Sequence, residues 1–394
     1  MSEAYRVEPD LEFISDLRRS GGDTLRKCFQ CATCSVVCPL SPAKDPFPRK
    51  EMIQAQWGLK EKLVRDPDIW LCHNCNDCST YCPRGAKPGD VLNALRKKSI
   101  EHYSVPSSLG RMVADRKHLL SLFIPPLILF LVVILFTNHF GDSKVLFHGK
   151  EIDISTRIVS WKMIPMLAVD VIFISTALFA VAVFAQGAIR FWRDMDAARP
   201  RLKGIVPSAI EVLKDILNHR NFKECGTNKE RYLGHLGIFY GFVALFVVTT
   251  CIFLGIYFLS LVVHIAPTPW PLWNPVKILA NLGAVALLAG CAISIRKRLV
   301  ETKDSSTGYF DWFLLVIITI VGASGLLAEI TRLLGVGILF YTLYYVHLVA
   351  VWSLFAYAPY SKLAHLVYRT LALIHAKASG RELTLKAQVT RLSA

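Results

Sequence analysis

The chain has 394 residues, of which 53% are hydrophobic and only 19% are charged, and its formal net charge is +15. A soluble globular protein has about a quarter charged residues, so this composition disfavours a wholly soluble enzyme and also excludes disordered and small disulfide-stabilised proteins. Residues 1–118 carry a net +4 (19 Lys/Arg minus 15 Asp/Glu) and residues 119–394 a net +11 (26 minus 15). The basic excess accompanies the apolar part of the chain, which indicates a membrane protein and no nucleic-acid partner.

Residues 1–118 form the first predicted unit, which ends in a stretch rich in Ser, Pro and Gly at 104–110. Charged side chains interrupt the first 27 residues, so no export signal is expected there. Eight of the 11 cysteines lie between Cys28 and Cys82. They are therefore expected to be metal ligands in a reducing compartment rather than disulfides. The helical spacing of apolar residues within 48–65 predicts a mainly helical domain of the two-cluster ferredoxin type.

The eight cysteines form two copies of the pattern C-x2-C-x2-C-x3-C-P. In bacterial ferredoxins with this spacing, three thiolates hold one 4Fe-4S cluster and the fourth holds the other cluster. We therefore predict two 4Fe-4S clusters, the first on Cys28, Cys31, Cys34 and Cys82, and the second on Cys72, Cys75, Cys78 and Cys38. Two structural zinc sites are the alternative, since they also use C-x2-C pairs, but zinc does not require a proline after the fourth cysteine of both copies.

Residues 119–394 are predicted to be a six-helix transmembrane cytochrome b bundle. The six apolar runs cover residues 119–137, 164–189, 233–263, 276–295, 312–330 and 336–357. Each approaches or exceeds the roughly 20 residues that a helix needs to cross a bilayer, and continuous apolar runs favour helices. Lys and Arg gather in residues 190–231 and 296–298, while the opposite loops hold few. The positive-inside rule then predicts a multi-pass protein of the inner (cytoplasmic) membrane, with the iron-sulfur domain and the C-terminal tail in the cytoplasm.

Three histidines fall in or beside the apolar runs, where an ionisable side chain is costly and points to function. His235 lies four residues after Arg231, and His365 lies four residues before Arg369. Both are therefore expected at the cytoplasmic edge, as a bis-histidine axial pair for one heme b. His347 precedes His365 by 18 residues, which is five turns or about 27 Å of one helix and suits two stacked hemes. Pro359 lies between them, and a kink there would make this alignment approximate. For each histidine, a hydrogen-bonded interfacial side chain is the alternative.

A second heme stays open, because the third, fourth and fifth runs have no histidine at the depth of His347. Three further histidines near the outer ends would reach it only if a helix end folds inward: His139, His148 and His264. Asp170 and Glu329 also fall toward the outer side. A carboxylate there can accept protons from a quinol, so both are candidates for a quinone site; a capped or hydrated helix-end carboxylate is the alternative.

Several segments resemble known redox proteins. The segment YVHLVAVWSLFAYAPYSKLAH at 345–365 resembles the last helix of respiratory nitrate reductase gamma subunits, and RYLGHLGIFYGF around His235 is similar to that family's first histidine-bearing helix. STGYFDWFLLVIITIVGASGLL at 306–327 resembles its fourth helix. That family has a second histidine ten residues after the first, where this chain has Leu245. The N-terminal domain resembles the C subunit of heterodisulfide reductase, and the membrane part resembles the E subunit of that enzyme.

Joined in this order, the two parts resemble the membrane subunits of quinone-interacting membrane-bound oxidoreductase (Qmo) complexes of sulfate reducers. The resemblance implies menaquinone as substrate, b hemes, two cytosolic flavin and iron-sulfur partner subunits, and electron delivery toward adenylylsulfate reductase. The predicted function is therefore to oxidise menaquinol and to pass electrons through heme b and the two clusters to these partners. The alternatives are a heterodisulfide-reductase-like or other quinone-linked respiratory subunit with another partner, and a membrane anchor without a redox role.

Overall fold

A computed structural model of the chain is mainly helical, as predicted. The structure describes residues 8–42, 45–137, 144–147, 150–153, 157–219, 229–259, 268–300 and 308–381. The three histidines considered above as partners for His347 lie outside these residues: His139, His148 and His264.

The N-terminal part consists of short helices arranged around the longer helix α7 (Pro88–Tyr103). The helix predicted within 48–65 is in fact two helices, because Gly58 between them has φ +69° and ends the first. The remaining helices of this part are α1 (Leu11–Leu17), α2 (Thr33–Val36), α3 (Arg49–Gln56), α4 (Lys60–Val64), α5 (Asp68–Leu71), α6 (Asp77–Thr80) and α8 (Ser107–Ala114).

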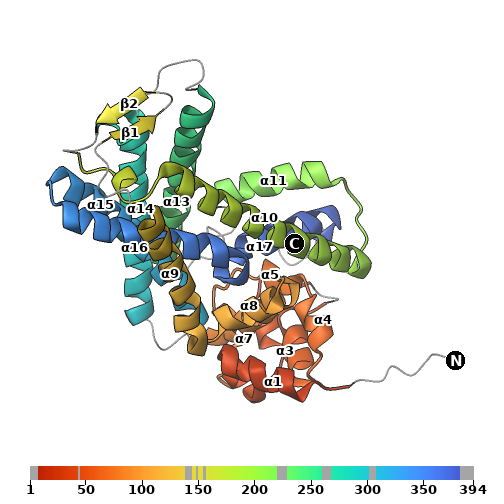
Figure 1. Ribbon diagram of the computed structural model, residues 1–394. Helices are drawn as coiled ribbons and strands as arrows, with labels where there is room; N and C mark the ends of the chain where they lie inside the picture. Colours follow the sequence, from red (N-terminus) through yellow and green to blue (C-terminus); the bar gives the residue numbers. More distant parts are fainter. Residues whose placement is uncertain are drawn as a thin grey trace.

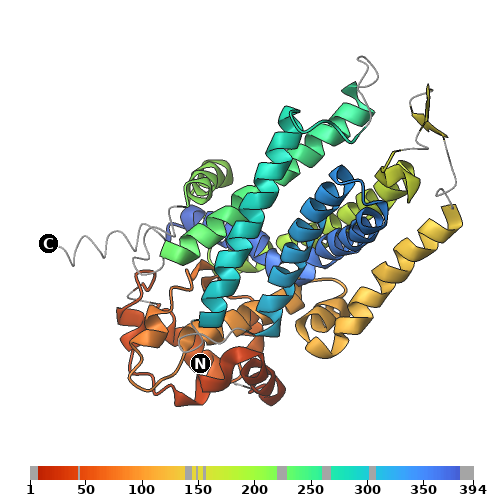
Figure 2. The ribbon, with the colours of Figure 1, turned by 90° about the vertical axis from the view of Figure 1, so that its left-hand side faces the viewer.

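Six helices of the described chain are long and apolar enough to cross a membrane, which confirms the predicted number. They are α9 (Leu119–Thr137), α10 (Met166–Ala198), α13 (Lys229–Tyr257), α14 (Pro275–Val300), α15 (Tyr309–Leu333) and α16 (Gly337–Tyr357). A short antiparallel hairpin, not predicted, pairs β1 (Lys144–Phe147) with β2 (Lys150–Asp153). The N-terminal part lies at one end of the helix bundle and the hairpin at the other (Figures 1 and 2).

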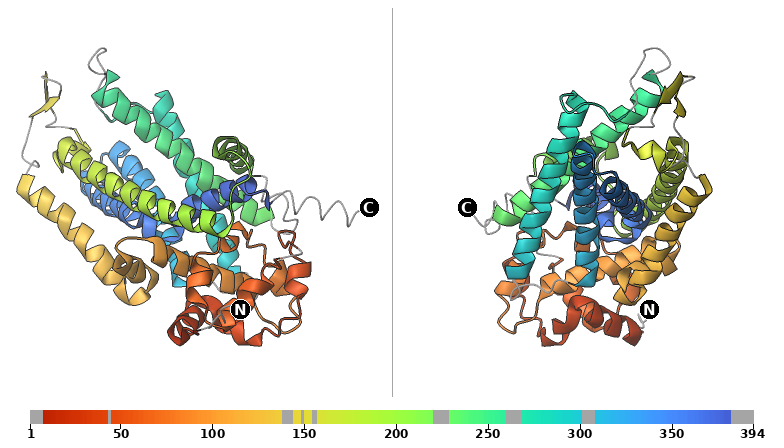
Figure 3. Two further views of the ribbon diagram at one scale, coloured as in Figure 1. Left: turned by 90° about the vertical axis from the view of Figure 1, so that its right-hand side faces the viewer. Right: turned by 60° about the vertical axis from the view of Figure 1, so that its left-hand side comes forward.

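Within the bundle, α9 and the α13–α14 pair lie on opposite sides, with α10, α15 and α16 between them (Figures 2 and 3). Glycines allow α13 and α14 to pack closely: a Cβ atom on Gly237 would lie 2.8 Å from the carbonyl oxygen of Ala286, and one on Gly290 2.6 Å from that of Gly234. Since successive residues rotate by about 100° around a helix, this glycine contact turns the neighbouring His235 away from α14.

His347 and His365 do not share one continuous helix, so the prediction of a five-turn alignment is wrong. Helix α16 ends at Tyr357, two 3-10 turns follow (Ala358–Tyr360 and Lys362–Ala364), and α17 (His365–Ala378) begins at His365 itself. Pro359 lacks the N–H that a continuing helix needs. Ser361 is extended (φ −100°, ψ 179°), and its hydroxyl accepts a hydrogen bond from Leu363 N at 3.2 Å, which starts a new turn.

One hydrophobic core joins the N-terminal part to the bundle. The ring centroid of Tyr103 lies 5.3 Å from that of Phe191 in α10 and 5.8 Å from that of Tyr368 in α17. Tyr368 in turn stacks on Trp70 at 5.3 Å. All four rings are buried, so the N-terminal part packs directly against the ends of two bundle helices. Residue 118, the boundary expected from the sequence, ends a 3-10 turn just before α9.

Candidate redox site

The two cysteine motifs have the same backbone conformation. At equivalent positions, Gln30 and Ala32 of the first motif and Asn74 and Asn76 of the second have φ values of 60°, 69°, 54° and 74°. A single-turn helix begins directly after Ala32 (α2) and after Asn76 (α6), and these two helices pack against each other. Residues other than glycine seldom adopt positive φ, and they do so where the backbone is shaped around a functional site.

The thiols of Cys38, Cys72, Cys75 and Cys78, here called the second cysteine group, line one cavity together with Phe47 and Leu92. Cys38 belongs to the first motif, so one thiol crosses to the other copy. Burial, then Cys72 and Cys75, raise the pKa of Cys38 to about 12, and burial also raises the pKa of Cys78. Such thiols become thiolates when a bound cationic metal compensates their charge. Four converging thiols therefore fit a 4Fe-4S cluster.

The other four thiols, Cys28, Cys31, Cys34 and Cys82, form the first cysteine group. Burial raises the pKa of Cys28, and the thiols of Cys82 and Cys31 add to this rise. Burial and Cys28 raise the pKa of Cys34 to about 11. Cys31 is exposed, and a hydrogen bond with the hydroxyl of Thr33 (3.4 Å) lowers the pKa of this thiol. The first group thus brings Cys82 to the first motif and reaches the protein surface.

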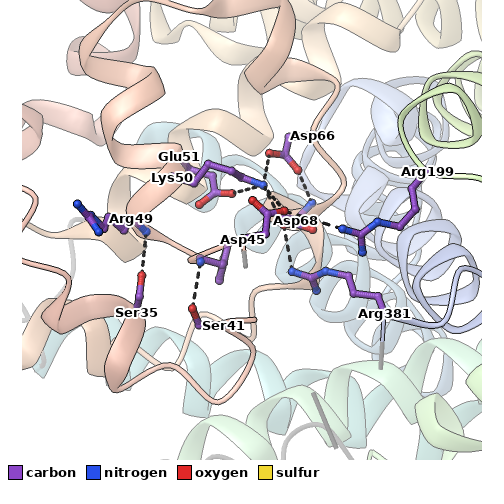
Figure 4. A network of polar contacts seen from close by, with 11 residues as sticks. Ser35, Ser41, Asp45, Arg49, Lys50, Glu51, Asp66, Asp68, Arg199 and Arg381 are labelled. Carbon is purple, nitrogen blue, oxygen red and sulfur yellow. Dashed lines mark hydrogen bonds and ion pairs between the residues drawn. The ribbon is translucent and has the colours of Figure 1, made fainter. Parts of the chain in front are cut away.

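A cluster of carboxylates in the N-terminal part surrounds a lysine. Oxygen atoms of Glu51, Asp66 and Asp68 lie within 4.8 Å of one another. However, Lys50 Nζ lies 3.3, 3.2 and 3.1 Å from these three carboxylates, so an ammonium group already lies among them (Figure 4). We call this the Lys50 network. It also contacts the bundle, because Arg381 pairs with Asp68 at 3.0 Å.

His235 and His365 come from different helices, α13 and α17, and an arginine four residues away from each of them binds the same cysteine loop. His365 Nδ1 lies 2.6 Å from the carbonyl oxygen of Lys362. Nδ1 therefore carries the proton and Nε2 keeps its lone pair. Burial lowers the pKa of His365 to about 4, so the ring is neutral. A neutral imidazole with its second nitrogen bonded to a carbonyl is typical of metal-bound histidine, so His365 fits an axial ligand of a heme.

Three arginines hold the backbone of the second cysteine motif. Arg369 and Arg96 both donate to the carbonyl oxygen of Cys72, each at 2.6 Å. Arg231 donates to the carbonyl oxygen of Asn74. The three arginines come from α17, α7 and α13, so three helices converge on one cysteine loop.

Two of these arginines lie one helical turn from the histidine pair. Arg231 precedes His235 by four residues in α13, and Arg369 follows His365 by four residues in α17. A displacement of either helix would therefore move a histidine and the cysteine loop together.

His219 was not predicted from the sequence. It is buried, and its ring centroid lies 5.5 Å from the ring centroid of His235 and 5.0 Å from the ring centroid of Phe239. It follows α11 (Ile205–Leu217) in a basic loop outside every apolar run. The amphipathic pattern of residues 205–217 was the one signal that could have drawn attention to it.

His347 lies between α15 and α16. Its Nδ1 lies 3.1 Å from both the carbonyl oxygen of Val321 and the hydroxyl of Ser324. A Cβ atom on Gly325 would lie 2.9 Å from the imidazole, so the ring packs directly on the neighbouring helix. Within the described residues no other histidine acts on it electrostatically. These contacts agree with the interfacial-histidine alternative.

The two candidate carboxylates lie in different helix pairs. Asp170 in α10 accepts a hydrogen bond from the hydroxyl of Tyr257 in α13. Glu329 in α15 pairs with Lys277 in α14 at 2.7 Å. An ion-paired Glu329 matches the structural alternative, whereas Asp170 lies beside a second group that can exchange a proton. Tyr257 was not singled out from the sequence, because tyrosines are common at helix ends in membranes.

Residues 24–86 match the 4Fe-4S dicluster domain. Among curated relatives, the C subunit of the H2:CoB-CoM heterodisulfide, ferredoxin reductase of Methanothermobacter marburgensis is 38% identical over 91 residues, which are 23% of this chain and 49% of that protein. A protein of Archaeoglobus profundus that is like the C subunit of heterodisulfide reductase is 35% identical over 107 residues, 26% of this chain and 57% of that protein. The chain thus spans about half the length of these relatives. It is an iron-sulfur electron-transfer protein related to the C subunit of heterodisulfide reductase.

The remaining comparisons extend over most of the chain. Citrate utilization protein B of Escherichia coli is 25% identical over 369 residues, 89% of each chain. No solved structure matches the chain. Residues 154–385 match the family model of citrate utilization protein B. Since this match covers more than half of the 394 residues, the chain belongs to the citrate utilization protein B family.

Proposed function

We propose that this chain is the membrane electron-transfer subunit of a quinone-linked oxidoreductase. It would hold one heme b between His235 and His365 and two 4Fe-4S clusters on the two cysteine groups. Bound there, these groups would carry single electrons between menaquinol and soluble partners. The observation that carries the proposal is that arginines one turn from each histidine, Arg231 and Arg369, bind the backbone of the second cysteine motif. The protein thereby fixes a membrane site and a cysteine site at one separation.

The positions of the two cysteine groups suggest the order in which electrons would pass through their clusters. The second group adjoins the histidine pair through these arginines, whereas the first group reaches solvent at Cys31. Large apolar side chains beside it are exposed: Phe29 (65%), Val36 (83%) and Tyr81 (63%). Exposed apolar side chains gathered at one place favour a protein contact. We expect two cytosolic flavin and iron-sulfur subunits to dock here and to pass electrons toward adenylylsulfate reductase.

The quinol site would lie at the other end of α13. Tyr257 is the last residue of this helix and Arg231 lies in its first turn, so the Asp170–Tyr257 pair and the cysteine loop lie about 40 Å apart at 1.5 Å per residue. Oxidation of menaquinol releases two protons along with two electrons. The carboxylate of Asp170, hydrogen-bonded to Tyr257, would accept a proton from the quinol hydroxyl. His235 precedes Tyr257 by 22 residues, or about 33 Å, so the electrons would need a second heme between this site and the histidine pair, and His347 is the candidate ligand for it.

The central test is heme content after removal of each imidazole. His235→Ala and His365→Ala should each abolish the reduced low-spin heme band and leave non-heme iron and acid-labile sulfide unchanged. His118→Ala, which alters an exposed histidine at the start of the first span, is the matched control and should keep the heme. Unchanged heme per chain in both test variants would rule out the proposed ligand pair.

A second candidate function rests on the match to citrate utilization protein B over 89% of both chains. The same membrane chain would then serve a redox partner used in citrate utilisation, not one used in sulfate reduction. Purification of the native complex separates the two, because the first requires flavin and iron-sulfur subunits together with binding to adenylylsulfate reductase. A chain with full iron-sulfur content and no heme would instead favour the non-redox anchor.

A further inference from the structure

Helix α11 exposes a narrow apolar stripe. Val206, Ile210, Leu213 and Leu217 have exposed fractions of 69%, 51%, 55% and 45%. Their spacing of four, three and four residues places them within an arc of about 60° at 100° per residue. Such a stripe is normally the face that a helix buries. In the described part of the chain it is instead open.

The opposite face of α11 is the one that holds the helix to the protein. Glu211 and Asp215 both pair with Lys377 of α17, at 3.2 and 2.9 Å. Ser208 and Val212 are buried on the side facing the protein. The orientation of α11 is therefore fixed by these contacts, and the apolar stripe points outward as a consequence.

The end of α11 lies at the depth of the membrane spans. The hydroxyl of Tyr240 donates to the carbonyl oxygen of Leu217 at 2.7 Å. Tyr240 is nine residues past Arg231, where the third span begins, which is about 13 Å along the helix. Figures 1 and 2 show α11 running across the direction of α13 and α14. With a bilayer around these spans, an exposed side chain at this depth, such as that of Leu217, would contact lipid.

The charged residues around α11 fit phospholipid headgroups. Lys203 precedes the helix, Lys214 borders the stripe next to Ile210, and both are exposed. The acidic side chains are directed to α17, away from the stripe. Basic residues flanking an apolar stripe are the pattern of helices that lie in a membrane interface.

We propose that α11 lies in the membrane interface on the side that carries the 4Fe-4S domain, with its apolar stripe in the phospholipid layer. Because His219 follows α11 and packs against His235, lipid contact would also hold this part of the histidine site in place. The inference depends on the membrane spans and not on a bound heme.

Photo-crosslinking in the full-length protein tests this directly. We would introduce p-benzoylphenylalanine at Val206 or Ile210, reconstitute the protein in phosphatidylethanolamine–phosphatidylglycerol vesicles, and irradiate it. Leu178 of α10, 65% exposed, is the lipid-facing control, and Glu211 on the face toward α17 is the negative control. Iron and sulfide content verify that each variant is folded.

We expect a mass gain of one phospholipid at Val206, Ile210 and Leu178, and none at Glu211. An adduct at Leu178 alone would overturn the proposal. So would a crosslink from Ile210 to another protein, or to a second copy of this chain, when the same variants are irradiated in native membranes.

Discussion

Replacing Lys50 with methionine would remove the cation from the Lys50 network while keeping most of the side-chain volume. Its ammonium lies 3.1 Å from Asp45 and Asp68, 3.2 Å from Asp66 and 3.3 Å from Glu51. Burial would lower the pKa of Lys50, but Asp66 and the other carboxylates outweigh burial and raise it. The variant would leave these four carboxylates facing one another.

The cost should be about 3 kcal/mol at pH 7.5, the lower end of the range for removing one partner of a buried ion pair, because the Lys50 side chain is still 20% exposed. Burial and Asp68 raise the pKa of Asp66 to about 6, and burial raises that of Glu51. Without Lys50 both values rise further, so the folded variant binds about one more proton than the wild type below pH 7.5, while unfolded carboxyl groups with pKa near 4 bind none.

A carboxyl group whose pKa is higher in the folded state stabilises that state at low pH, and this stabilisation is lost as the pH rises through the folded pKa. The variant should therefore lose about 1.4 kcal/mol per pH unit relative to the wild type between pH 6, below which Asp66 of the wild type also binds a proton, and pH 7.5. Its deficit should shrink to about 1 kcal/mol at pH 6 and stay near that value at pH 5.5. Lowering the pH should therefore restore most of the stability that the Lys50→Met variant loses.

The assay is a guanidinium titration in detergent, followed by cluster absorbance, since Phe47 close to Lys50 lines the cavity of the second cysteine group. With a slope of about 4 kcal/mol per M, the midpoint should fall by about 0.8 M at pH 7.5 and about 0.3 M at pH 5.5. Lys60→Met is the control: its pair with Asp10 is 3.6 Å long and exposed, so its shift should be about 0.1 M. Equal shifts of Lys50→Met at both pH values would refute the reasoning.

The remaining predictions concern the redox groups. Cys38→Ser should remove the electron paramagnetic resonance signal of the cluster on the second cysteine group and keep the signal of the cluster on the first group. The control is Cys291→Ser, at a buried cysteine outside both groups, which should keep both signals. If Cys38→Ser removed the signal of the first group's cluster instead, the assignment would be reversed. Arg369→Gln should lower the midpoint potential of the cluster on the second cysteine group, because it removes a positive charge that is hydrogen-bonded to the motif at 2.6 Å. The control Arg193→Gln, at an exposed arginine, should leave this potential unchanged. Equal potentials in Arg369→Gln and the wild type would argue against a role for Arg369. Asp170→Asn should slow reduction by menaquinol but not by dithionite, and an unchanged menaquinol rate would remove Asp170 from the quinol site.

Much of the architecture was predictable because its signals are local. The length of an apolar run decides whether a helix can cross a bilayer, and no knowledge of its neighbours is needed. The six predicted spans agree in number with the six membrane-length helices of the described chain. The spacing of Cys72 to Cys78 is likewise contained in one loop, and the match of residues 24–86 to the dicluster domain agrees with it.

The geometry between segments was not predictable in the same way. The five-turn alignment of His347 with His365 assumes one helix through Pro359. The backbone instead leaves the helix near Pro359, and a new turn starts at Ser361. His219 reaches the site from a loop that carries no apolar periodicity. Periodicity describes one helix at a time, so it fails wherever the chain turns between helices.

The contacts of the three arginines could not be predicted from the sequence either. Arg96, Arg231 and Arg369 act on backbone carbonyl groups, which every residue has, so no sequence pattern marks their acceptors. The arginines themselves, however, lie on helices, and two of those helices also carry His235 and His365. The separation between the histidine pair and the second cysteine group therefore depends on a few charge-assisted hydrogen bonds of about 1.5–3 kcal/mol each, in addition to the buried aromatic core that joins the N-terminal part to the bundle. Weakening them should alter electron transfer between the two sites before it unfolds either one, which makes these arginines the most informative positions in the chain.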